Sequence, residues 1–323
     1  MDKAAKEILH LIKKYDVITI HGHVNPDCDC YGSSLGLREI LRDNFKNKKI
    51  YSLGYGTDAL YDMLGKYDEV DDEVVKNSLA IIVDCSETPR IMDQRIVTAR
   101  QIIKIDHHIE STPFIGVKWV DTNSIACAQM IAEFAMKFHL KISQKAANLL
   151  YLGICTDSGR FRYLPTNAKT HRIVADLYDI GIDPQKMFKV LYQSDANYVK
   201  YQALLVSKFK MTKHRVIYCF ADVQDYEQYG LKYEQVSKNV NVVGNIIGCP
   251  VWTLFTRSPE GTIRIEFRSH NYNVQKIAVK YGGGGHEHAA GARLDNQKDF
   301  SLAMKVVEDL EKMVKEEEEK NAK

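Results

Sequence analysis

The stretch Leu79-Ala80-Ile81-Ile82-Val83-Asp84 decides the fold class of this chain. Apolar residues in succession that end in an acid are typical of a strand buried on both faces of a parallel sheet. Two other runs have this form: Val17-Ile18-Thr19-Ile20, which ends at His21, and Ile102-Ile103-Lys104-Ile105, which ends at Asp106-His107-His108. These runs predict a sheet whose strands each finish in a polar residue.

Helical patterns separate these strands. We expect helices over about residues 32–45, 124–139 and 143–155, and a further strand over 50–53. Strands that alternate with helices imply βαβ units. The predicted fold class of this part is therefore α/β, with a doubly wound, mostly parallel sheet.

The chain has 323 residues, which exceeds the size at which one hydrophobic core keeps growing. We expect a metal-binding domain over residues 1–185, a helical connection over 186–210 and a second, smaller α/β domain over 211–323. Strand-like alternation at 215–220, 251–256 and 262–268 supports the second domain.

Composition limits the class of protein. Hydrophobic residues make up 45%, charged residues 27% and the formal net charge is +2, as in ordinary soluble proteins. A charge this close to neutral argues against a groove that tracks long nucleic acid. Seven cysteines without a C-x-x-C pair indicate reduced thiols and disfavour a zinc ribbon. No apolar run approaches the roughly 18 residues that span a membrane, so we expect a cytoplasmic protein.

Acids and histidines gather at the ends of the predicted elements. They lie in the loop His23-Val24-Asn25-Pro26-Asp27-Cys28-Asp29, at Asp84, in Asp106-His107-His108 and at Asp157. Strand carboxyl ends of an open α/β sheet form its binding crevice, so these side chains should meet there. So many like charges require cations. Mixed carboxylate and imidazole ligands favour Mn²⁺ over an all-oxygen Mg²⁺ or Ca²⁺ site, and two metals about 4 Å apart suit in-line attack on phosphorus.

Each of these residues has a simpler interpretation when taken alone. Asp27 or Asp29 would be a turn residue after Pro26, Asp84 a helix cap, and a lone histidine a structural residue. Their joint position at strand ends favours the metal site. His21 ends its strand and is left out of the predicted site.

The order of these residues resembles the DHH phosphoesterase superfamily: an H-x-N-P-D-x-D loop, an isolated Asp, a D-H-H triplet and a later Asp. The segment 281–291, YGGGGHEHAAG, is similar to the glycine-rich G-G-G-H signature of the DHHA1 domain, and 263–269, IRIEFRS, to its R-S strand. The resemblance spans about residues 15 to 295. D-H-H alone would be weak, but the two signatures together are specific.

The resemblance implies a role for each matching residue. One divalent metal would be held by His23, Asp27 and Asp84, and the other by Asp29, Asp84, His107 and Asp157. His108 would stabilise charge on the substrate phosphate or protonate the leaving oxygen, and Asp106 would orient a ligand histidine. Water between the metals would be the nucleophile. Mn²⁺ is the expected ion, with Mg²⁺ and Co²⁺ as alternatives.

The resemblance also implies a set of substrate-binding residues: Arg268, Ser269, Gly283, Gly284, Gly285 and His286. Consecutive glycines let the backbone approach a phosphate closely and form an anion-binding nest. As a bare string, four glycines would instead be a flexible loop.

Two pairs of residues have open interpretations. Cys28 and Cys30 stand where the family commonly has small residues, and they could coordinate soft ions, oxidise or simply pack. Arg160 and Arg162 could face substrate phosphates or pair with surface acids.

Within the superfamily, length and the second domain resemble the compact nanoRNase and pAp-phosphatase group and the stand-alone enzymes that split linear pApA. The implied partners are short RNA, linear dinucleotides and pAp, with no long nucleic acid and no membrane. A homodimer is compatible with a domain pair of this size. The alternatives are a family II-like pyrophosphatase, which has a different C-terminal domain, and a non-catalytic nucleotide-binding protein on the same fold.

Overall fold

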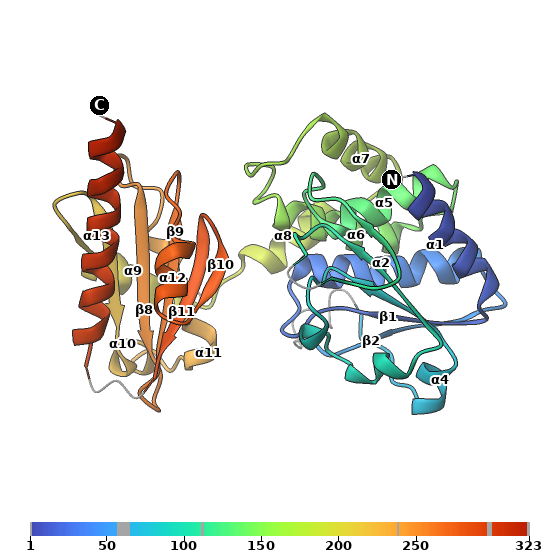
Figure 1. Ribbon diagram of the computed structural model, residues 1–323, viewed down its shortest axis with the longest axis horizontal. Helices are drawn as coiled ribbons and strands as arrows, with labels where there is room; N and C mark the ends of the chain where they lie inside the picture. Colours follow the sequence, from blue (N-terminus) through green and yellow to red (C-terminus); the bar gives the residue numbers. More distant parts are fainter. Residues whose placement is uncertain (1, 57–64, 111–112, 238, 296–298, 322–323) are drawn as a thin grey trace. The chain divides into compact units, whose positions relative to one another are not determined.

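The computed structural model describes the chain except for residues 1, 57–64, 111–112, 238, 296–298 and 322–323 (Figure 1). It divides into two compact units, Met1–Tyr192 and Gln193–Lys323, which we describe separately. The stretch expected to connect the domains holds two helices. Helix α8 (Pro184–Tyr192) belongs to the first unit and α9 (Ala196–Lys208) to the second.

The first unit is built on a five-stranded sheet of order β2-β1-β3-β4-β5. All its paired strands are parallel. The strands are β1 (Val17–His21), β2 (Lys49–Leu53), β3 (Leu79–Val83), β4 (Gln101–Asp106) and β5 (Val117–Val120). The predicted mostly parallel α/β fold is confirmed. Strand β5 was missed because it is short and only Trp119 in it is buried, so no apolar run marks it.

Helices cover this sheet and bury most of its apolar side chains. They are α1 (Asp2–Lys14), α2 (Cys28–Asn44), α4 (Asp72–Lys76), α5 (Cys127–Lys137), α6 (Gln144–Asp157) and α7 (Ala168–Asp179), with 3₁₀ turns η1 (Thr88–Arg90) and η2 (Gln94–Thr98). The main core joins β1, β3 and β4 to α1, α2, α5 and α6. A smaller cluster that includes Ala80 and Ile82 lies around η1 and η2.

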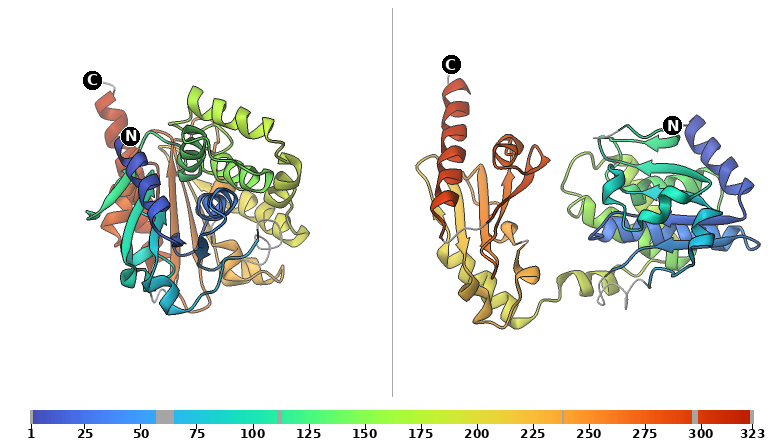
Figure 2. Two further views of the ribbon diagram at one scale, coloured as in Figure 1. Left: turned by 90° about the vertical axis from the view of Figure 1, so that its right-hand side faces the viewer. Right: turned by 60° about the horizontal axis from the view of Figure 1, so that its bottom comes forward.

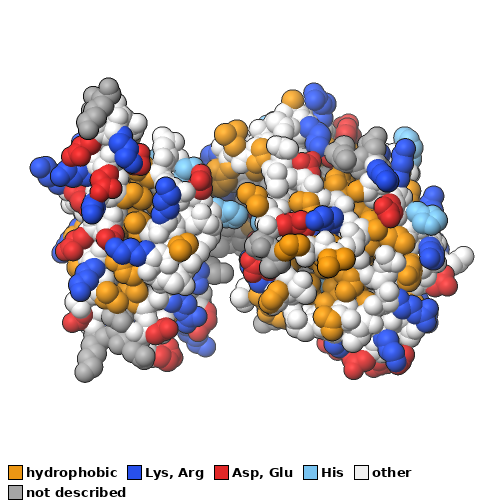
Figure 3. Space-filling model, in the orientation of Figure 1, with side chains coloured by type: hydrophobic (Ala, Val, Ile, Leu, Met, Phe, Trp, Pro, Cys, Tyr) orange, Lys and Arg blue, Asp and Glu red, His pale blue; other side chains and the backbone are white. Residues whose placement is uncertain are grey.

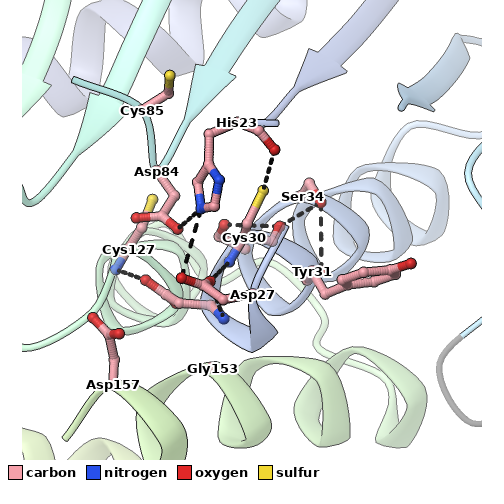
Figure 4. Close-up of polar contacts among 12 residues, drawn as sticks. His23, Asp27, Cys30, Tyr31, Ser34, Asp84, Cys85, Cys127, Gly153 and Asp157 are labelled. Carbon is pink, nitrogen blue, oxygen red and sulfur yellow. Dashed lines mark hydrogen bonds and ion pairs between the residues drawn. The ribbon is translucent and has the colours of Figure 1, made fainter. Parts of the chain in front are cut away.

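Helices α2 and α6 lie side by side and approach closely (Figures 1 and 4). Glycines allow this approach. A Cβ on Gly32 would lie 2.5 Å from the carbonyl oxygen of Leu149, and a Cβ on Gly153 would lie 2.7 Å from Oδ1 of Asp29. Neither contact is tolerable for a side-chain carbon. The crossing therefore places the first turn of α2 directly against α6.

The second unit is built on a six-stranded mixed sheet of order β10-β11-β9-β8-β7-β6. Its strands are β6 (Lys210–Met211), β7 (Val216–Ala221), β8 (Val251–Arg257), β9 (Ile263–Ser269), β10 (Gly284–His286) and β11 (Ala289–Leu294). Only the β7–β8 pair among these is parallel. Strands β7, β8 and β9 match the predicted ones, and the second, smaller α/β domain is confirmed.

Two layers of helix cover this second sheet (Figure 2). One apolar cluster lies under α12 (Gln275–Lys280) and α13 (Ser301–Asn321). The other lies on the opposite face, under α9, α10 (Val223–Glu227), α11 (Tyr233–Val236) and η3 (Val240–Val243). Strand residues alternate between these two clusters, which fixes the face to which each side chain belongs.

Charges are mixed over the surface. On the face shown in Figure 3, basic and acidic side chains are interspersed over both units, in keeping with the small net charge. Within the described part of the chain, no helix is both long enough and apolar enough to cross a membrane.

Candidate metal centre

Five segments bring acids and histidines together at the carboxyl edge of the first sheet, and Figure 4 shows His23, Asp27, Asp84 and Asp157 among them. They are the loop after β1, the first turn of α2, the ends of β3 and β4, and the last turn of α6. Parallel strands place their carboxyl ends on one edge, as the sequence analysis expected. The predicted metal ligands of the first unit therefore lie in one cluster.

The first group of ligands surrounds His23. Its Nε2 lies 3.6 Å from Oδ2 of Asp27 and 3.5 Å from Oδ2 of Asp84. Its Nδ1 lies 2.9 Å from the carbonyl oxygen of Val24, to which it can donate a proton. This tautomer leaves a lone pair on Nε2, directed toward the two carboxylates.

The second group surrounds His107. Its Nε2 lies 3.3 Å from Oδ1 of Asp84, 3.3 Å from Oδ2 of Asp157 and 3.8 Å from Oδ2 of Asp29. Its Nδ1 lies 3.2 Å from the carbonyl oxygen of Ser124, so this ring is oriented in the same way as His23. The two groups contain the residues of the two ligand sets that the resemblance implies.

Asp84 belongs to both groups, with one oxygen in each. The residue is 2% exposed, and its Oδ1 has no hydrogen-bond partner although it is buried. Its backbone is in the left-handed region, with φ of 54°, where non-glycine residues are uncommon and functional sites are over-represented. A buried carboxylate is unfavourable unless a cation neutralises it. The site therefore fits a pair of metal ions bridged by Asp84.

The charges of the cluster act strongly on one another. Burial and the charges of Asp84 and Asp27 raise the pKa of Asp157 to about 7. Burial would lower the pKa of His23, but hydrogen bonds to Asp27 and Asp84 raise it to about 10. Burial would also lower the pKa of His107, but a hydrogen bond to Asp84 and the charges of Asp29 and Asp157 raise it to about 10. In the metal-free site, bound protons therefore offset the negative charge of the carboxylates, and bound metal cations would displace these protons.

Asp29 has an additional structural role. Its Oδ2 accepts a hydrogen bond from the backbone amide of Cys127 at 2.7 Å, and its Oδ1 accepts one from Ala128 at 2.9 Å. These amides begin α5, whose N-cap residue, Ala126, provides no side-chain cap. Asp29 thus caps a helix that lies far along the chain, where a negative charge is favourable. The only sequence signal for this contact was that α5 begins without a capping side chain of its own. That signal does not show that Asp29 supplies the cap.

The D-H-H triplet is supported by a buried lysine that the sequence analysis missed. Asp106 Oδ1 lies 2.9 Å from Nδ1 of His108, and its Oδ2 lies 3.1 Å from Nζ of Lys104. Although burial opposes it, His108 and Lys104 hold the pKa of Asp106 below its usual range. Asp106 was expected to orient a ligand histidine, but its hydrogen bond goes to His108. A lysine inside the apolar run 102–105 was the available signal.

The two cysteines of the first motif lie beside the cluster. Cys30 is fully buried, and its Sγ lies within 4.8 Å of ligand atoms of His23 and Asp84. Burial and the charges of Asp84 and Asp27 raise its pKa well above the usual value. Burial and the charges of Asp27 and Asp29 raise the pKa of Cys28 to about 12. Both side chains are therefore neutral thiols in the metal-free protein.

Arg160 and Arg162 follow Asp157 and contact tyrosines. The guanidinium of Arg160 lies 4.8 Å from the ring centre of Tyr192 and hydrogen-bonds its hydroxyl. Arg162 lies 5.7 Å from the ring centre of Tyr163. Across the described ranges neither arginine forms an ion pair, so pairing with surface acids does not explain them.

The expected substrate residues of the second unit also lie together. Strand β11 pairs with β9 on one side and β10 on the other, so that His286, Ala289 and Arg268 form one row across three strands. Ser269, at the end of β9, donates a hydrogen bond to the carbonyl oxygen of Tyr272 at 2.5 Å and lies 3.2 Å from Nδ1 of His288.

The structure gives two of the glycines a packing reason. A Cβ on Gly283 would lie 2.0 Å from the carbonyl oxygen of Gly291, and one on Gly285 would lie 2.7 Å from that of Ala289. The absence of a side chain at Gly283 and Gly285 therefore allows the backbone of β11 to lie this close to them. A Cβ on Gly284 would meet nothing within 4 Å, so this position is the open one.

Comparisons with known proteins agree with this architecture. The DHH family, N-terminal domain, matches residues 17–154, and the DHHA1 domain matches residues 199–313. The bifunctional oligoribonuclease and PAP phosphatase NrnA of Bacillus subtilis is 34% identical over 97% of this chain and 99% of its own length. A protein from Streptococcus mutans, named a probable bifunctional oligoribonuclease and PAP phosphatase NrnA, is also 34% identical, over 90% and 93%.

A solved structure shares the fold. The crystal structure of an exopolyphosphatase-related protein from Bacteroides fragilis matches 98% of this chain and 96% of its own length, with a TM-score of 0.85 and 20% identity. The likeness shows the fold, and the relatives in sequence and the two matched domains identify the family. The chain belongs to the DHH family of phosphoesterases, with a C-terminal DHHA1 domain.

Proposed function

We propose that this protein is a manganese-dependent phosphodiesterase and phosphatase that hydrolyses very short oligoribonucleotides, including pApA, to nucleoside monophosphates, and pAp to AMP. The observation that carries the proposal is Asp84. It is buried and offers one oxygen to each of two groups of ligand atoms, Oδ2 toward His23 and Oδ1 toward His107. This is the arrangement that a two-metal phosphoryl site requires.

Each of the two metal ions has a proposed set of ligands. His23, Asp27 and Asp84 would hold one ion, and Asp29, Asp84, His107 and Asp157 the other. Two bound cations would lower the pKa of a water nucleophile and neutralise phosphate oxygens. Two imidazoles among the carboxylates favour Mn²⁺, with Mg²⁺ and Co²⁺ as the alternatives.

His108 is the proposed proton donor to the leaving oxygen. Its Nδ1 lies 2.9 Å from Oδ1 of Asp106, a contact that orients the ring. Lys104 keeps Asp106 ionised, so that the carboxylate accepts from His108 rather than carrying a proton itself. The contacts of Lys104 with Asp106 and of Asp106 with His108 thus position the His108 ring at the edge of the metal cluster.

The substrate class rests on the relatives and on the second unit. Two relatives that are each 34% identical carry oligoribonuclease and PAP phosphatase in their names. Arg268, Ser269, Gly283, Gly284, Gly285 and His286 are the residues that we propose to bind the nucleotide, with phosphate near Arg268 and His286. The seven free cysteines suit a reducing, cytoplasmic setting.

A hydrolysis screen tests the proposal. Purified protein with Mn²⁺, Mg²⁺ or Co²⁺ would be assayed on pApA, a series of short RNAs, pAp and pyrophosphate, beside the Asp84→Asn variant. Release of monophosphates from the short nucleotides by wild type alone would support the proposal. Rapid cleavage of pyrophosphate with inert nucleotides would replace it with a pyrophosphatase, and inertness toward all substrates would favour a nucleotide-binding protein.

A further inference from the structure

A row of three polar residues crosses the second sheet at the end of β9 remote from Arg268. Arg264 of β9 pairs directly with Arg293 of β11 on one side and with Thr256 of β8 on the other. Their strand neighbours Ile263, Ile265 and Ala292 belong to the core under α13. Since side chains alternate along a strand, all three residues of the row are on the opposite face, the one that carries α11 and η3.

The row is unfavourable as it stands. Two arginines directly opposite each other on one face repel. Thr256 is 1% exposed and its Oγ1 has no hydrogen-bond partner, and Nε of Arg264 is likewise buried without a partner. Buried donors are rarely left unpaired, and each such atom calls for a specific explanation.

The nearby acids do not resolve the excess of donors. Oε1 of Glu266 lies 3.9 Å from Nη2 of Arg264 and also 3.9 Å from Nη2 of Arg268, while its other oxygen accepts from the amide of Val240 at 3.3 Å. One carboxylate is therefore shared between two arginines. Among the residues that the structure describes, Arg293 forms no ion pair. Within the described ranges, the row therefore has more cationic groups than the single Glu266 carboxylate beside it, which favours binding of an additional anion.

An aromatic ring lies on the same face of the sheet as the row. Tyr233, the first residue of α11, packs against the apolar cluster on this same face and is half-buried. Burial raises the pKa of Tyr233, while the positive charges of Arg264 and Arg293 act on its hydroxyl in the opposite direction. The acids that act on it are Glu234 and Glu260, and Glu260 is fully exposed. An aromatic ring and two guanidinium groups on one face are the combination that binds single-stranded nucleic acid by stacking and phosphate contact.

We propose that Thr256, Arg264 and Arg293 bind a phosphate group of the oligonucleotide and that Tyr233 stacks on the adjacent base, forming a second nucleotide subsite. The inference rests on the proposed function and extends it to substrate length. Arg264 precedes Arg268 by four strand residues, a separation of about 13 Å. Both phosphates of pAp lie on one ribose and cannot span this separation. The subsite therefore serves oligonucleotides and is dispensable for pAp.

The first test compares substrates within each variant. Arg264→Gln and Arg293→Gln would be assayed on pAp and on 5′-phosphorylated RNAs of two to five nucleotides. Loss of one charged contact should lower kcat/KM about tenfold for the longer RNAs and leave pAp hydrolysis unchanged. Lys305→Gln is the matched control, because this exposed residue of α13 removes the same charge from the other face of the unit.

The second test is binding without metal. In EDTA, the dependence of RNA affinity on salt should weaken by about 0.7 in log–log slope for each arginine removed, and not at all for Lys305→Gln. Arg293 is exposed, so its variant keeps the fold if Arg264→Gln does not. An equal loss on pAp and RNA in Arg293→Gln, or an unchanged salt slope, would overturn the subsite. If wild type cleaves nothing, the proposed function fails, and the salt slope alone then decides whether the subsite exists.

Discussion

Gly153 lies beside the candidate metal centre. The substitution Gly153→Ala should disturb that centre although it replaces none of the proposed ligands. The new Cβ would lie 2.7 Å from Oδ1 of Asp29 and 2.7 Å from Cβ of Ala128. Ordinary contact begins at 3.4 Å, so the neighbours must move by 3.4 − 2.7, or about 0.7 Å. Asp29 cannot rotate away, because both of its oxygens are bound by the first amides of α5.

The magnitude follows from these contacts. Overpacking costs about 1–3 kcal/mol, partly offset by the roughly 1 kcal/mol by which helices favour alanine over glycine. Stability should therefore fall only modestly. The site is more sensitive than the fold, because a misplacement on the order of 1 Å can lower a rate about a hundredfold. We expect weaker Mn²⁺ binding and hydrolysis reduced by about that factor.

Gly36→Ala is the matched control. Its Cβ would lie 2.9 Å from Cδ2 and 3.2 Å from Cγ of Leu150 at the same α2–α6 contact, where a flexible side chain can yield and no site residue is present. Urea unfolding in EDTA would measure the fold, and calorimetric Mn²⁺ titration and short-RNA hydrolysis would measure the site. Near-normal Mn²⁺ affinity and activity in Gly153→Ala would refute the reasoning, as would an equal loss of both in Gly36→Ala.

Three further perturbations probe the same centre. Asp84→Asn should lower the rate of hydrolysis more than about a hundredfold, and the variant should still fold because Asn tolerates the left-handed backbone at this position. Circular dichroism would check the fold, and a hydrolysis assay the activity. A variant with normal activity would show that Asp84 is not part of the site. Lys104→Met removes the lysine that pairs with the buried Asp106 and should lower the free energy of unfolding in urea by about 3–5 kcal/mol. The control Lys118→Met removes the exposed partner of Glu110 and should lower it by less than about 1 kcal/mol. Similar losses in the two variants would contradict the role of Lys104. The pKa values of His23 and His107 are raised from 6.5 to about 10, so between these pH values the folded metal-free protein binds more protons than the unfolded chain, and its stability should decline as pH rises from about 6.5 to 10. Melting temperatures measured in EDTA should show this decline, and saturating Mn²⁺ should remove it. A melting temperature in EDTA that does not change with pH would count against the raised pKa values.

The strands and the positions of the ligands could be read from the sequence for one physical reason. Strands β1, β3 and β4 are buried on both sides, so they appear as apolar runs, and the residues that follow them necessarily reach one edge of a parallel sheet. That argument placed His23, Asp84 and His107 near one another before any coordinates. Their roles as metal ligands remain predictions until a metal is bound.

The remainder depended on contacts between distant segments. The capping of α5 by Asp29 and the burial of Lys104 beside Asp106 follow from how the helices and strands pack, which no local pattern encodes. Strands β10 and β11 were missed because glycine and alanine carry little strand signal, although Gly283 and Gly285 are there to admit a neighbouring strand.

The capping of α5 by Asp29 also orders events during synthesis of the protein. The hydrogen bond from Cys127 joins residues 98 positions apart, so it closes a long loop and forms only after much of the unit has been translated. Asp157, at the end of α6, emerges later still. On the proposed assignment of ligands, a chain on the ribosome cannot acquire its second metal before Asp157 has emerged, and metal uptake would report that the chain has been translated through α6.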